Sequence, residues 1–317
     1  IALAPEHASA AQELVSCADM AMYRAKSSGL PFAMYEQDFE DSGNLLRLAE
    51  ELRDALENGE LRLHYQPQLD LRTGEMLASE VLIRWPHPKL GLIPPLKFLP
   101  LAEQAGLMGD LTRWVLEQAL AQCAEWRAGG TESAVSVNIS PSNMLEPGFT
   151  ELVKAQLASN ALPAGALVLE ITETSIITDF ERAKEIIDEL SQLGVVVSVD
   201  DFGTGFTSLA YLSSLAVREL KLDRTFTTHV AERDLQLVRS TIQLGHALGL
   251  RVVAEGVEDN ETLTLLTELG CDVGQGYFIG MPEPPEHALP DSLTVAPSQV
   301  PAPAPPPSTR APAPPVT

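Results

Sequence analysis

The chain has 317 residues, of which 45% are hydrophobic, and a formal net charge of −23 at pH 7. This length and apolar content are enough for one large hydrophobic core or two smaller ones. The acidic balance excludes a sequence-independent grip on long nucleic acids, because such binding requires a basic surface. No apolar run approaches the roughly 18 residues of a membrane-spanning helix, so we expect no membrane contact from this part of the protein.

Differences in texture divide the sequence into four parts. Residues 1–35 show a helical pattern that stops at a Gly-Leu-Pro sequence, and we interpret 36–44 as a linker. Residues 45–285 form the main domain: a helical stretch over about 45–58 comes first, and strand-like and helix-like runs then alternate from Glu60 to Pro282. Residues 286–317 are rich in proline and cannot bury much apolar area, which predicts a disordered tail. The chain starts at Ile1 rather than at methionine, so we expect a fragment of a longer protein.

The part from 45 to 285 contains eight short β-like runs, most of them separated by helical stretches. The runs are 61–69, 76–85, 134–140, 166–172, 195–201, 219–223, 250–256 and 272–280. A turn at 72–74 joins the first two, which predicts an antiparallel hairpin. Eight strands with intervening helices predict a (β/α)8 barrel. An open doubly wound sheet is the alternative, but no GxGxxG sequence follows the first run.

Polar side chains stand at or near the ends of most of these runs. They are Glu80, Asn138, Glu170, Glu173, Asp200, Asp201, Lys221, Asp223, Glu255, Glu258 and Gln275. Taken singly, each is better explained as an ordinary polar residue that meets solvent. In a barrel, however, the carboxyl ends of the strands share one face, and so many carboxylates together are unfavourable unless cations bind. Oxygen donors without clustered Cys or His predict Mg²⁺ or Mn²⁺.

The run 195–201 ends in two adjacent aspartates, and a glycine-rich loop follows. Adjacent strand residues point to opposite faces, so Asp200 and Asp201 share a site only if the strand ends there and the backbone twists. Gly203 and Gly205 permit such a twist. One aspartate could then bridge two metals, about 3.5–4 Å apart, in the arrangement that recurs in phosphodiester hydrolysis.

A series of motifs resembles the EAL-domain cyclic di-GMP phosphodiesterases. In the family's order, the motifs are SEVLIRW with RWPHPKLGLIPPLKFLPLAEQAGL, VNIS, LEITET, DDFGTGFTSLAYL, LKLDRTF, VVAEGVE and GCDVGQGYF, and the likeness spans about 45–285. Val81 replaces the alanine of the family signature; both are small and apolar, so we expect activity to survive. Residues 1–35, with ADMAMYRAKSSG, resemble the C-terminal end of a GGDEF (diguanylate cyclase) domain. Because the chain contains no GGDEF or GGEEF signature, only a remnant of that domain is expected.

The resemblance implies an α/β fold, a TIM-like (β/α)8 barrel whose first strand is antiparallel. It implies hydrolysis of cyclic di-GMP to linear pGpG by two-metal in-line attack of water, in bacterial second-messenger signalling and biofilm control. Each site would hold two Mg²⁺ or Mn²⁺ ions, and Ca²⁺ would inhibit because it prefers longer and more numerous oxygen contacts.

The resemblance also assigns roles to individual residues. The implied ligands of the first metal are Glu80, Asn138, Glu170 and Asp200, and those of the second are Asp200, Asp201 and Glu255. The implied catalytic residues are Glu80, Asp201, Lys221 and Glu255, and the implied substrate contacts are Gln66, Leu82, Arg84 and Gln275. Lys221 would orient or help to deprotonate the attacking water, and Arg84 would pair with a phosphate. Glu173 would support the DFGTG loop.

Two other functions stay open on sequence alone. A catalytically silent cyclic di-GMP receptor is the main alternative, although such domains usually lack a metal ligand or the DDFGTG loop, and here every position is filled. A different metal-dependent barrel hydrolase is the other. The resemblance further implies a homodimer that forms through the barrel face near the glycine-rich loop. The apolar residues just after this loop fit the dimer interface and the core packing of their helix equally well; they are Phe206, Leu209, Tyr211 and Leu212. Unpaired cysteines favour a cytoplasmic location, with anchoring of the longer parent protein to the inner membrane left open.

Overall fold

The computed structural model describes residues 1–8, 14–15, 17–18, 21–22, 32, 34–35, 42–172, 179–202, 209–227 and 232–288. Near the N-terminus, the pairs 14–15, 17–18 and 21–22 are helical, in line with the predicted pattern. The first long helix, α2, starts at Ser42, inside the predicted linker. Nearly all of the predicted tail lies outside the described residues, and so does most of the linker.

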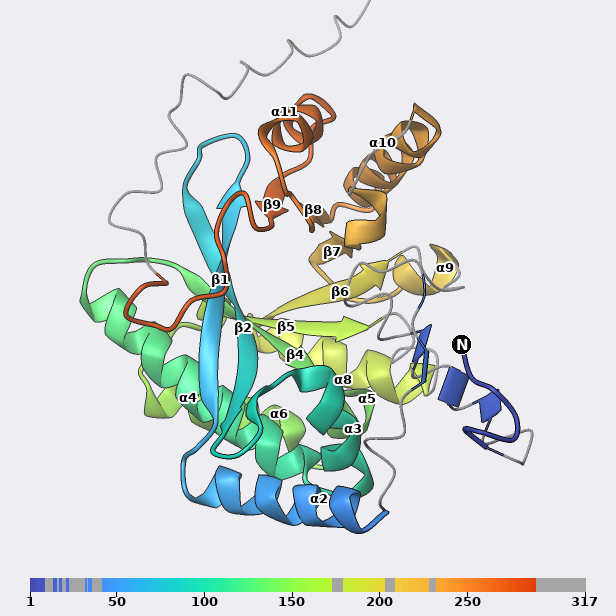
Figure 1. The fold of residues 1–317 in the computed structure, drawn as a ribbon. Helices are drawn as coiled ribbons and strands as arrows, with labels where there is room; N and C mark the ends of the chain where they lie inside the picture. Colours follow the sequence, from blue (N-terminus) through green and yellow to red (C-terminus); the bar gives the residue numbers. More distant parts are fainter. Residues whose placement is uncertain are drawn as a thin grey trace, which may run out of the picture.

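Eight strands form a closed barrel (Figure 1). They are β1 (Arg62–Asp70), β2 (Met76–His87), β4 (Ala134–Ile139), β5 (Leu167–Thr172), β6 (Val196–Phe202), β7 (Glu219–Leu222), β8 (Arg251–Ala254) and β9 (Val273–Gln275). Strand β1 pairs antiparallel with both β2 and β9 and so closes the barrel, whereas the other neighbouring barrel strands are parallel. The predicted barrel with an antiparallel first strand is confirmed, and the open sheet is excluded.

A tight turn explains the antiparallel start. The Asp70 carboxylate accepts the backbone N–H groups of Arg72 and Thr73, each at 2.8 Å. Gly74 adopts a φ of 75°, a left-handed conformation that glycine takes without steric cost. Strand β2 then continues past the predicted run and pairs with a short outer strand, β3 (Gly91–Ile93), which the sequence did not predict.

Helices surround the barrel (Figure 1). They are α2 (Ser42–Glu57), α3 (Pro95–Gln104), α4 (Met108–Ala128), α5 (Pro141–Met144), α6 (Phe149–Ser159), α8 (Phe180–Leu193), α9 (Leu209–Leu212), α10 (Glu232–Ala247) and α11 (Asn260–Glu268), with the 3-10 turns η1 (Ala164–Ala166) and η2 (Arg224–Phe226). Helices α4, α8 and α10 pack on β4, β6 and β8. Among the described residues, no helix combines the length and apolar character needed to cross a membrane.

The strand sequences separate apolar from polar residues across the barrel wall. On β4, β5 and β6 the apolar residues belong to the core that α4, α6 and α8 cover; they are Val135, Val137, Ile139, Leu167, Leu169, Ile171, Val197 and Val199. The residues between them include Asn138, Glu170 and Ser198, which stand side by side in the strand register. Since strand side chains alternate between faces, these polar residues share the inner face of the barrel.

Candidate active site

The buried ammonium of Lys221, on β7, is the centre of a carboxylate cluster. Its Nζ lies 2.6 Å from Glu255 Oε1 and 2.8 Å from Glu170 Oε2. Asp200 Oδ1 follows at 3.5 Å and Glu80 Oε2 at 3.7 Å. The Lys221 side chain is only 1% exposed, so these carboxylates are its counter-ions in place of water. Five strand ends therefore meet at one point inside the barrel.

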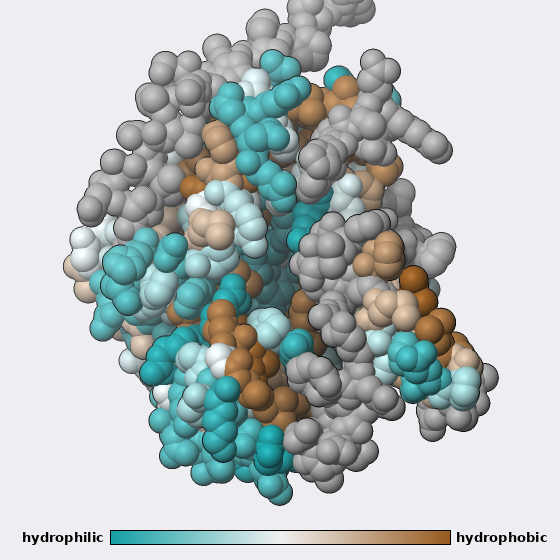
Figure 2. All heavy atoms as spheres, viewed as in Figure 1, coloured by the Kyte–Doolittle hydropathy of each residue, from teal (hydrophilic) through white to brown (hydrophobic). Residues whose placement is uncertain are grey.

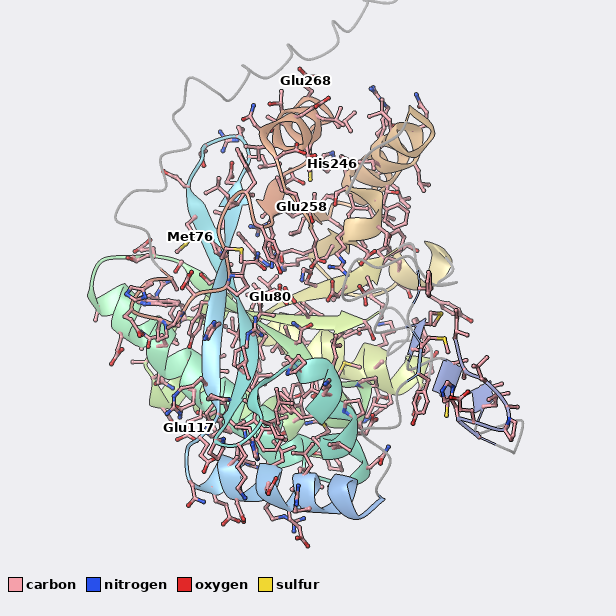
Figure 3. The ribbon with its side chains drawn as sticks, viewed as in Figure 1. Met76, Glu80, Glu117, His246, Glu258 and Glu268 are labelled. Carbon is pink, nitrogen blue, oxygen red and sulfur yellow. The ribbon has the colours of Figure 1, made fainter. Side chains whose placement is uncertain are left out.

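The location of the cluster is visible in two views. Figure 3 shows Glu80 at the middle of the barrel, whereas Glu117, His246 and Glu268 lie on the outer helices. The same face in Figure 2 is hollowed at its centre, and hydrophilic residues line the hollow. The cluster thus lies inside the barrel and beside an open, polar face.

The carboxylates of the cluster outnumber its single ammonium group, and burial together with this imbalance shifts the pKa values of several members. Burial raises the pKa of Glu170 well above its usual value, although Lys221 opposes this. Burial likewise raises the pKa of Glu255 to about 7, again against the pull of Lys221. Burial alone would lower the pKa of Lys221, but the surrounding carboxylates raise it well above its usual value. Lys221 is therefore an ammonium at neutral pH, and the cluster around it holds excess negative charge.

Glu80 is the exception, because hydrogen bonds stabilise its ionised form. Burial would raise its pKa, but Lys221 together with donors from Gln275 and Asn138 lowers it. The Asn138 amide donates to Glu80 Oε1 at 2.7 Å, and the Gln275 amide donates to Glu80 Oε2. Glu80 is therefore an ionised, fully engaged carboxylate at neutral pH.

A distortion of β6 sets the positions of the two adjacent aspartates. Two residues of β6 stand opposite one residue of β7, since the register shifts between Val199 and Phe202. Asp201 has a φ of 56°, rare for a residue other than glycine, and its N–H donates to the Asp200 carboxylate at 2.9 Å. The twist expected at the following glycines is thus already made at Asp201. Those glycines, at 203 and 205, lie outside the described residues.

Two glutamines, Gln66 and Gln275, lie on the Glu80 side of the cluster. Gln275 also donates to Gln66 Oε1 at 3.1 Å, which brings the predicted contact Gln66 next to Glu80. Leu82 and Arg84 follow Glu80 on β2 at two-residue spacing, so they share its face of the strand. Burial lowers the pKa of Arg84, which is partly buried.

The structure therefore brings most of the predicted site residues together. The side chains joined by hydrogen bonds or ion pairs are those of Gln66, Glu80, Asn138, Glu170, Asp200, Lys221, Glu255 and Gln275. Asp201 follows Asp200 on β6, and Leu82 and Arg84 follow Glu80 on β2. Glu173 lies outside the described residues, so its loop-supporting role stays a prediction.

Sequence reasoning missed three residues that touch the site. The Ser136 hydroxyl donates to Glu170 Oε1 at 2.5 Å, and the Gln68 amide donates to Gln275 Oε1 at 2.8 Å. The two-residue spacing of Ser136 before Asn138, and of Gln68 after Gln66, places each on the same strand face as a predicted residue. The Thr227 hydroxyl, which bonds to the backbone of Glu255, follows a 3-10 turn and has no comparable signal.

The chemistry of the predicted ligand atoms suits a hard divalent cation. In the described part of the chain, no three His, Cys, Asp or Glu side chains form a ready metal-binding group. The four carboxylates surround the Lys221 ammonium. All of the donors are carboxylate or amide oxygens, which Mg²⁺ and Mn²⁺ prefer. The four carboxylates near Lys221 also carry more negative charge than one ammonium balances.

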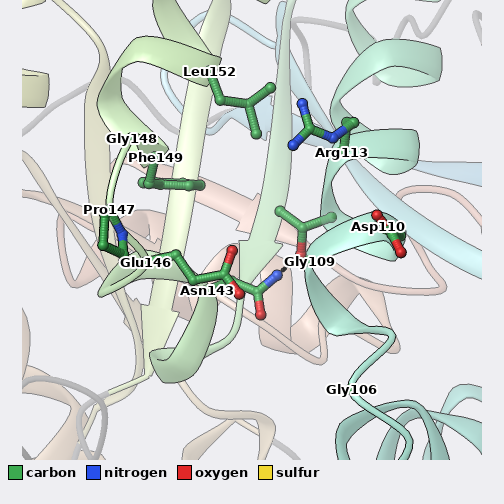
Figure 4. A pocket seen from close by; sticks show the side chains of 11 residues that line it. Gly106, Gly109, Asp110, Arg113, Asn143, Glu146, Pro147, Gly148, Phe149 and Leu152 are labelled. Carbon is green, nitrogen blue, oxygen red and sulfur yellow. Dashed lines mark hydrogen bonds between the residues drawn. The ribbon is translucent and has the colours of Figure 1, made fainter.

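A cavity of about 270 Å³ lies elsewhere, between the start of α4 and the connection from α5 to α6 (Figure 4). Arg113, Asn143 and Glu146 are among its lining residues. The Asn143 amide donates to Met108 O at 2.7 Å and to Thr112 Oγ1 at 2.5 Å, which ties α5 to α4. No residue of the carboxylate cluster lines this cavity, so it is no part of the candidate active site.

Comparison with known families identifies the barrel. The EAL domain family model matches residues 49–282, which is most of the chain. The chain belongs to the EAL domain family.

Similar proteins carry names from cyclic di-GMP metabolism. A bifunctional diguanylate cyclase/cyclic di-GMP phosphodiesterase, MucR of Pseudomonas aeruginosa, is 40% identical over 294 residues, covering 91% of this chain and 43% of MucR. The cyclic di-GMP phosphodiesterase PdeR of Escherichia coli is 38% identical over 288 residues, covering 90% of this chain and 43% of PdeR. The chain thus spans less than half the length of these curated relatives.

A solved structure agrees with the sequence comparison. The structure described as PaMucR phosphodiesterase in complex with c-di-GMP matches with a TM-score of 0.74 and 41% identity, covering 77% of this chain and 100% of that chain. The EAL domain of FimX from Pseudomonas aeruginosa bound to c-di-GMP matches with a TM-score of 0.69 and 26% identity, over 75% of this chain and 96% of that one. Both similarities agree with a TIM-like EAL barrel.

Proposed function

We propose that this chain hydrolyses cyclic di-GMP to linear pGpG. The observation that carries the proposal is the convergence of four carboxylates on the buried Lys221, in a barrel of the EAL family. The names of MucR and PdeR point to the same substrate. Every position that the family motifs assign to the site carries the expected residue in this sequence.

We propose that the cluster holds two Mg²⁺ or Mn²⁺ ions. Glu80, Asn138, Glu170 and Asp200 would hold the first, and Asp200, Asp201 and Glu255 the second. When bound, such ions stabilise the charge that develops on the phosphodiester and lower the pKa of the attacking water. Ca²⁺ would inhibit, since it prefers longer and more numerous contacts.

In this proposal Lys221 orients the attacking water rather than deprotonating it. The raised pKa keeps Lys221 protonated, and an ammonium can only donate hydrogen bonds. The carboxylates around Lys221 fix the position of its ammonium group, and hence the direction in which a remaining N–H group can donate to the water. Glu255, whose side chain is 21% exposed, would ligate the second metal beside that water.

The substrate would lie over Gln66, Leu82 and Arg84. The Arg84 guanidinium would pair with a phosphate oxygen, and Leu82 would contact an apolar edge of the ligand. The excess carboxylate charge repels a phosphodiester, so cations at the cluster would strengthen its binding.

Three further proposals go beyond the active site. We propose that residues 1–35 are the remnant of a GGDEF domain, that the protein is cytoplasmic, and that the barrel dimerises. The apolar residues that follow the glycine loop support the last point only in part. Leu212 is buried in the core, whereas Tyr211 is 49% exposed and its ring packs 4.6 Å from that of Phe180. The side chains of Phe206 and Leu209 lie outside the described ones.

Product analysis tests the proposed function. The purified chain is incubated with cyclic di-GMP and Mg²⁺ or Mn²⁺, and the nucleotides are separated by chromatography. We expect linear pGpG to accumulate, and we expect excess EDTA to stop the reaction. Tight binding of cyclic di-GMP without any product would instead identify a silent receptor, as in the alternative function.

A further inference from the structure

Three glutamines form a buried hydrogen-bonded chain that ends on Glu80. Gln68 donates to Gln275 Oε1 at 2.8 Å, and Gln275 donates to both Gln66 Oε1 and Glu80 Oε2. Gln66 donates in turn to Gly280 O at 3.0 Å. The three glutamines are 4–7% exposed, so water does not substitute for these bonds.

The charge of Glu80 fixes the direction of every bond in this chain. An ionised carboxylate can only accept, so Gln275 must turn its NH₂ group toward Glu80. The same NH₂ group donates to Gln66 Oε1, which leaves only the carbonyl oxygen of Gln275 on its other side. That oxygen needs a donor, and Gln68 supplies one directly across the β1–β9 pairing.

A reversed amide at Gln275 would be unfavourable. It would place a carbonyl oxygen against the Glu80 carboxylate in a buried site, and it would leave an NH₂ group facing the NH₂ group of Gln68. Buried polar groups without partners are costly to the folded state. In its observed orientation the Gln68 amide donates to Gln275 Oε1, and this bond favours the orientation in which Gln275 turns its NH₂ group toward Glu80.

We propose that Gln68 is a positioning residue for the hydrolysis. It acts through Gln275: its amide holds the Gln275 NH₂ group against Glu80, and this bond in turn fixes the carboxylate that would ligate the first metal. The proposal rests on the proposed function for its catalytic meaning. The hydrogen-bond polarity on which it depends is independent of the substrate.

Two substitutions separate polarity from packing. Gln68→Met removes the donor with little change in shape, whereas Gln68→Glu presents an acceptor to the Gln275 carbonyl. We expect Gln68→Glu to weaken Mn²⁺ binding by about 10- to 100-fold and Gln68→Met by less, since supports of metal ligands have effects of this size. Mn²⁺ binding is measured by electron paramagnetic resonance without nucleotide, and turnover is measured in parallel.

A double-mutant cycle identifies the path of the effect. In a Gln275→Met background there is no amide to orient, so neither substitution at Gln68 should weaken Mn²⁺ binding further. Thr112→Val is the matched control, because Thr112 is a buried hydrogen-bonded residue on α4, at the cavity away from the cluster. We expect that control to lower thermal stability and to leave Mn²⁺ binding unchanged.

The outcomes distinguish this proposal from the proposed function. Equal effects of both substitutions, or full effects that persist in the Gln275→Met background, would overturn the role of Gln68. If the wild-type chain binds Mn²⁺ with the expected hierarchy of variants but produces no pGpG, the positioning role stands and the hydrolytic function fails. Thermal unfolding in EDTA confirms that each variant is folded before binding is compared.

Discussion

The Thr227 hydroxyl donates a hydrogen bond to the main-chain carbonyl of Glu255. Thr227 is fully buried, and it follows the η2 turn. The same turn packs so closely on Gly256 that a Cβ there would lie 2.6 Å from Arg224 Cβ. On its other side, the Glu255 N–H donates to Leu222 O at 3.1 Å. The backbone of Glu255 is thus held from both directions, although its side chain must extend toward Lys221.

We therefore expect Thr227→Val to weaken Mn²⁺ binding, by about tenfold, because Val keeps the shape and loses the hydroxyl. The loss of one buried hydrogen bond also lowers the free energy of unfolding by about 1 kcal/mol. Thr227→Ser retains the hydroxyl and should keep nearly the wild-type affinity. Mn²⁺ titration without nucleotide checks both variants. Equal affinity of the Val and Ser variants would show that the hydroxyl does not position Glu255.

Lys221→Met tests whether the ammonium holds the cluster together. Without it, the neighbouring carboxylates stay ionised only at a high energetic cost, so folding takes up protons and stability falls as pH rises. In EDTA we expect the free energy of unfolding to fall by about 3–5 kcal/mol at pH 8, as is typical when a buried ion pair is broken, and to fall by less at pH 5. Chemical denaturation at both pH values measures it.

Lys184→Met is the control for that experiment. Lys184 pairs with Asp188 at 2.5 Å on α8, but both side chains are about a third exposed. Surface pairs of this kind contribute roughly 0–1 kcal/mol. A loss of stability in Lys221→Met that is independent of pH, or no larger than in Lys184→Met, would contradict the charge account of the cluster.

The raised pKa of Glu255 predicts that its contribution to the free energy of unfolding falls as pH rises, which is opposite to the behaviour of most carboxylates. Its pKa is raised from 4.5 to about 7 in the folded chain, so the folded state binds a proton that the unfolded state releases. Its contribution to stability is fully present below about pH 4.5 and is lost as pH rises through about 7. In EDTA, Glu255→Gln should remove this part of the pH dependence, on the order of a few kcal/mol.

The pH dependence of Mn²⁺ binding is a second test of the raised pKa of Glu255. Because the carboxylate must lose its proton to ligate a cation, Mn²⁺ affinity of the wild-type chain should rise between about pH 6 and pH 8. The rise should be much weaker in Glu255→Gln. Identical pH profiles for the two proteins would place the titrating group elsewhere in the cluster.

The strand pattern predicted most of this architecture, and local distortions account for the differences. Polar residues at or near the ends of the predicted runs pointed to Asn138, Glu170 and Asp200, which the structure brings together inside the barrel. The last predicted run is a strand only over 273–275, because Val257 bonds to Gln275 O and accepts from Phe278, which turns the chain. Sequence patterns contain no signal for such loop-to-strand bonds.

The site was predicted less completely than the fold for a similar reason. Motif positions point to the residues that we propose meet the substrate, but the partners that orient them depend on strand register. The pairing of Gln68 with Gln275 joins residues 207 positions apart in the chain, and only the closure of β1 on β9 brings them together. The left-handed Asp201 was anticipated as a twist, although the sequence pointed to the glycines after it.

The separation of binding from chemistry in Glu80→Ala tests the central claim most directly. The substitution removes a proposed ligand of the first metal and leaves Gln66, Leu82 and Arg84 for the nucleotide. We measure pGpG formation with Mg²⁺ and cyclic di-GMP affinity with Ca²⁺, for the variant and the wild type. The account predicts that turnover falls by at least about a hundredfold while affinity stays within a few fold. Wild-type turnover in the variant, or a parallel collapse of turnover and affinity in a folded protein, would contradict it.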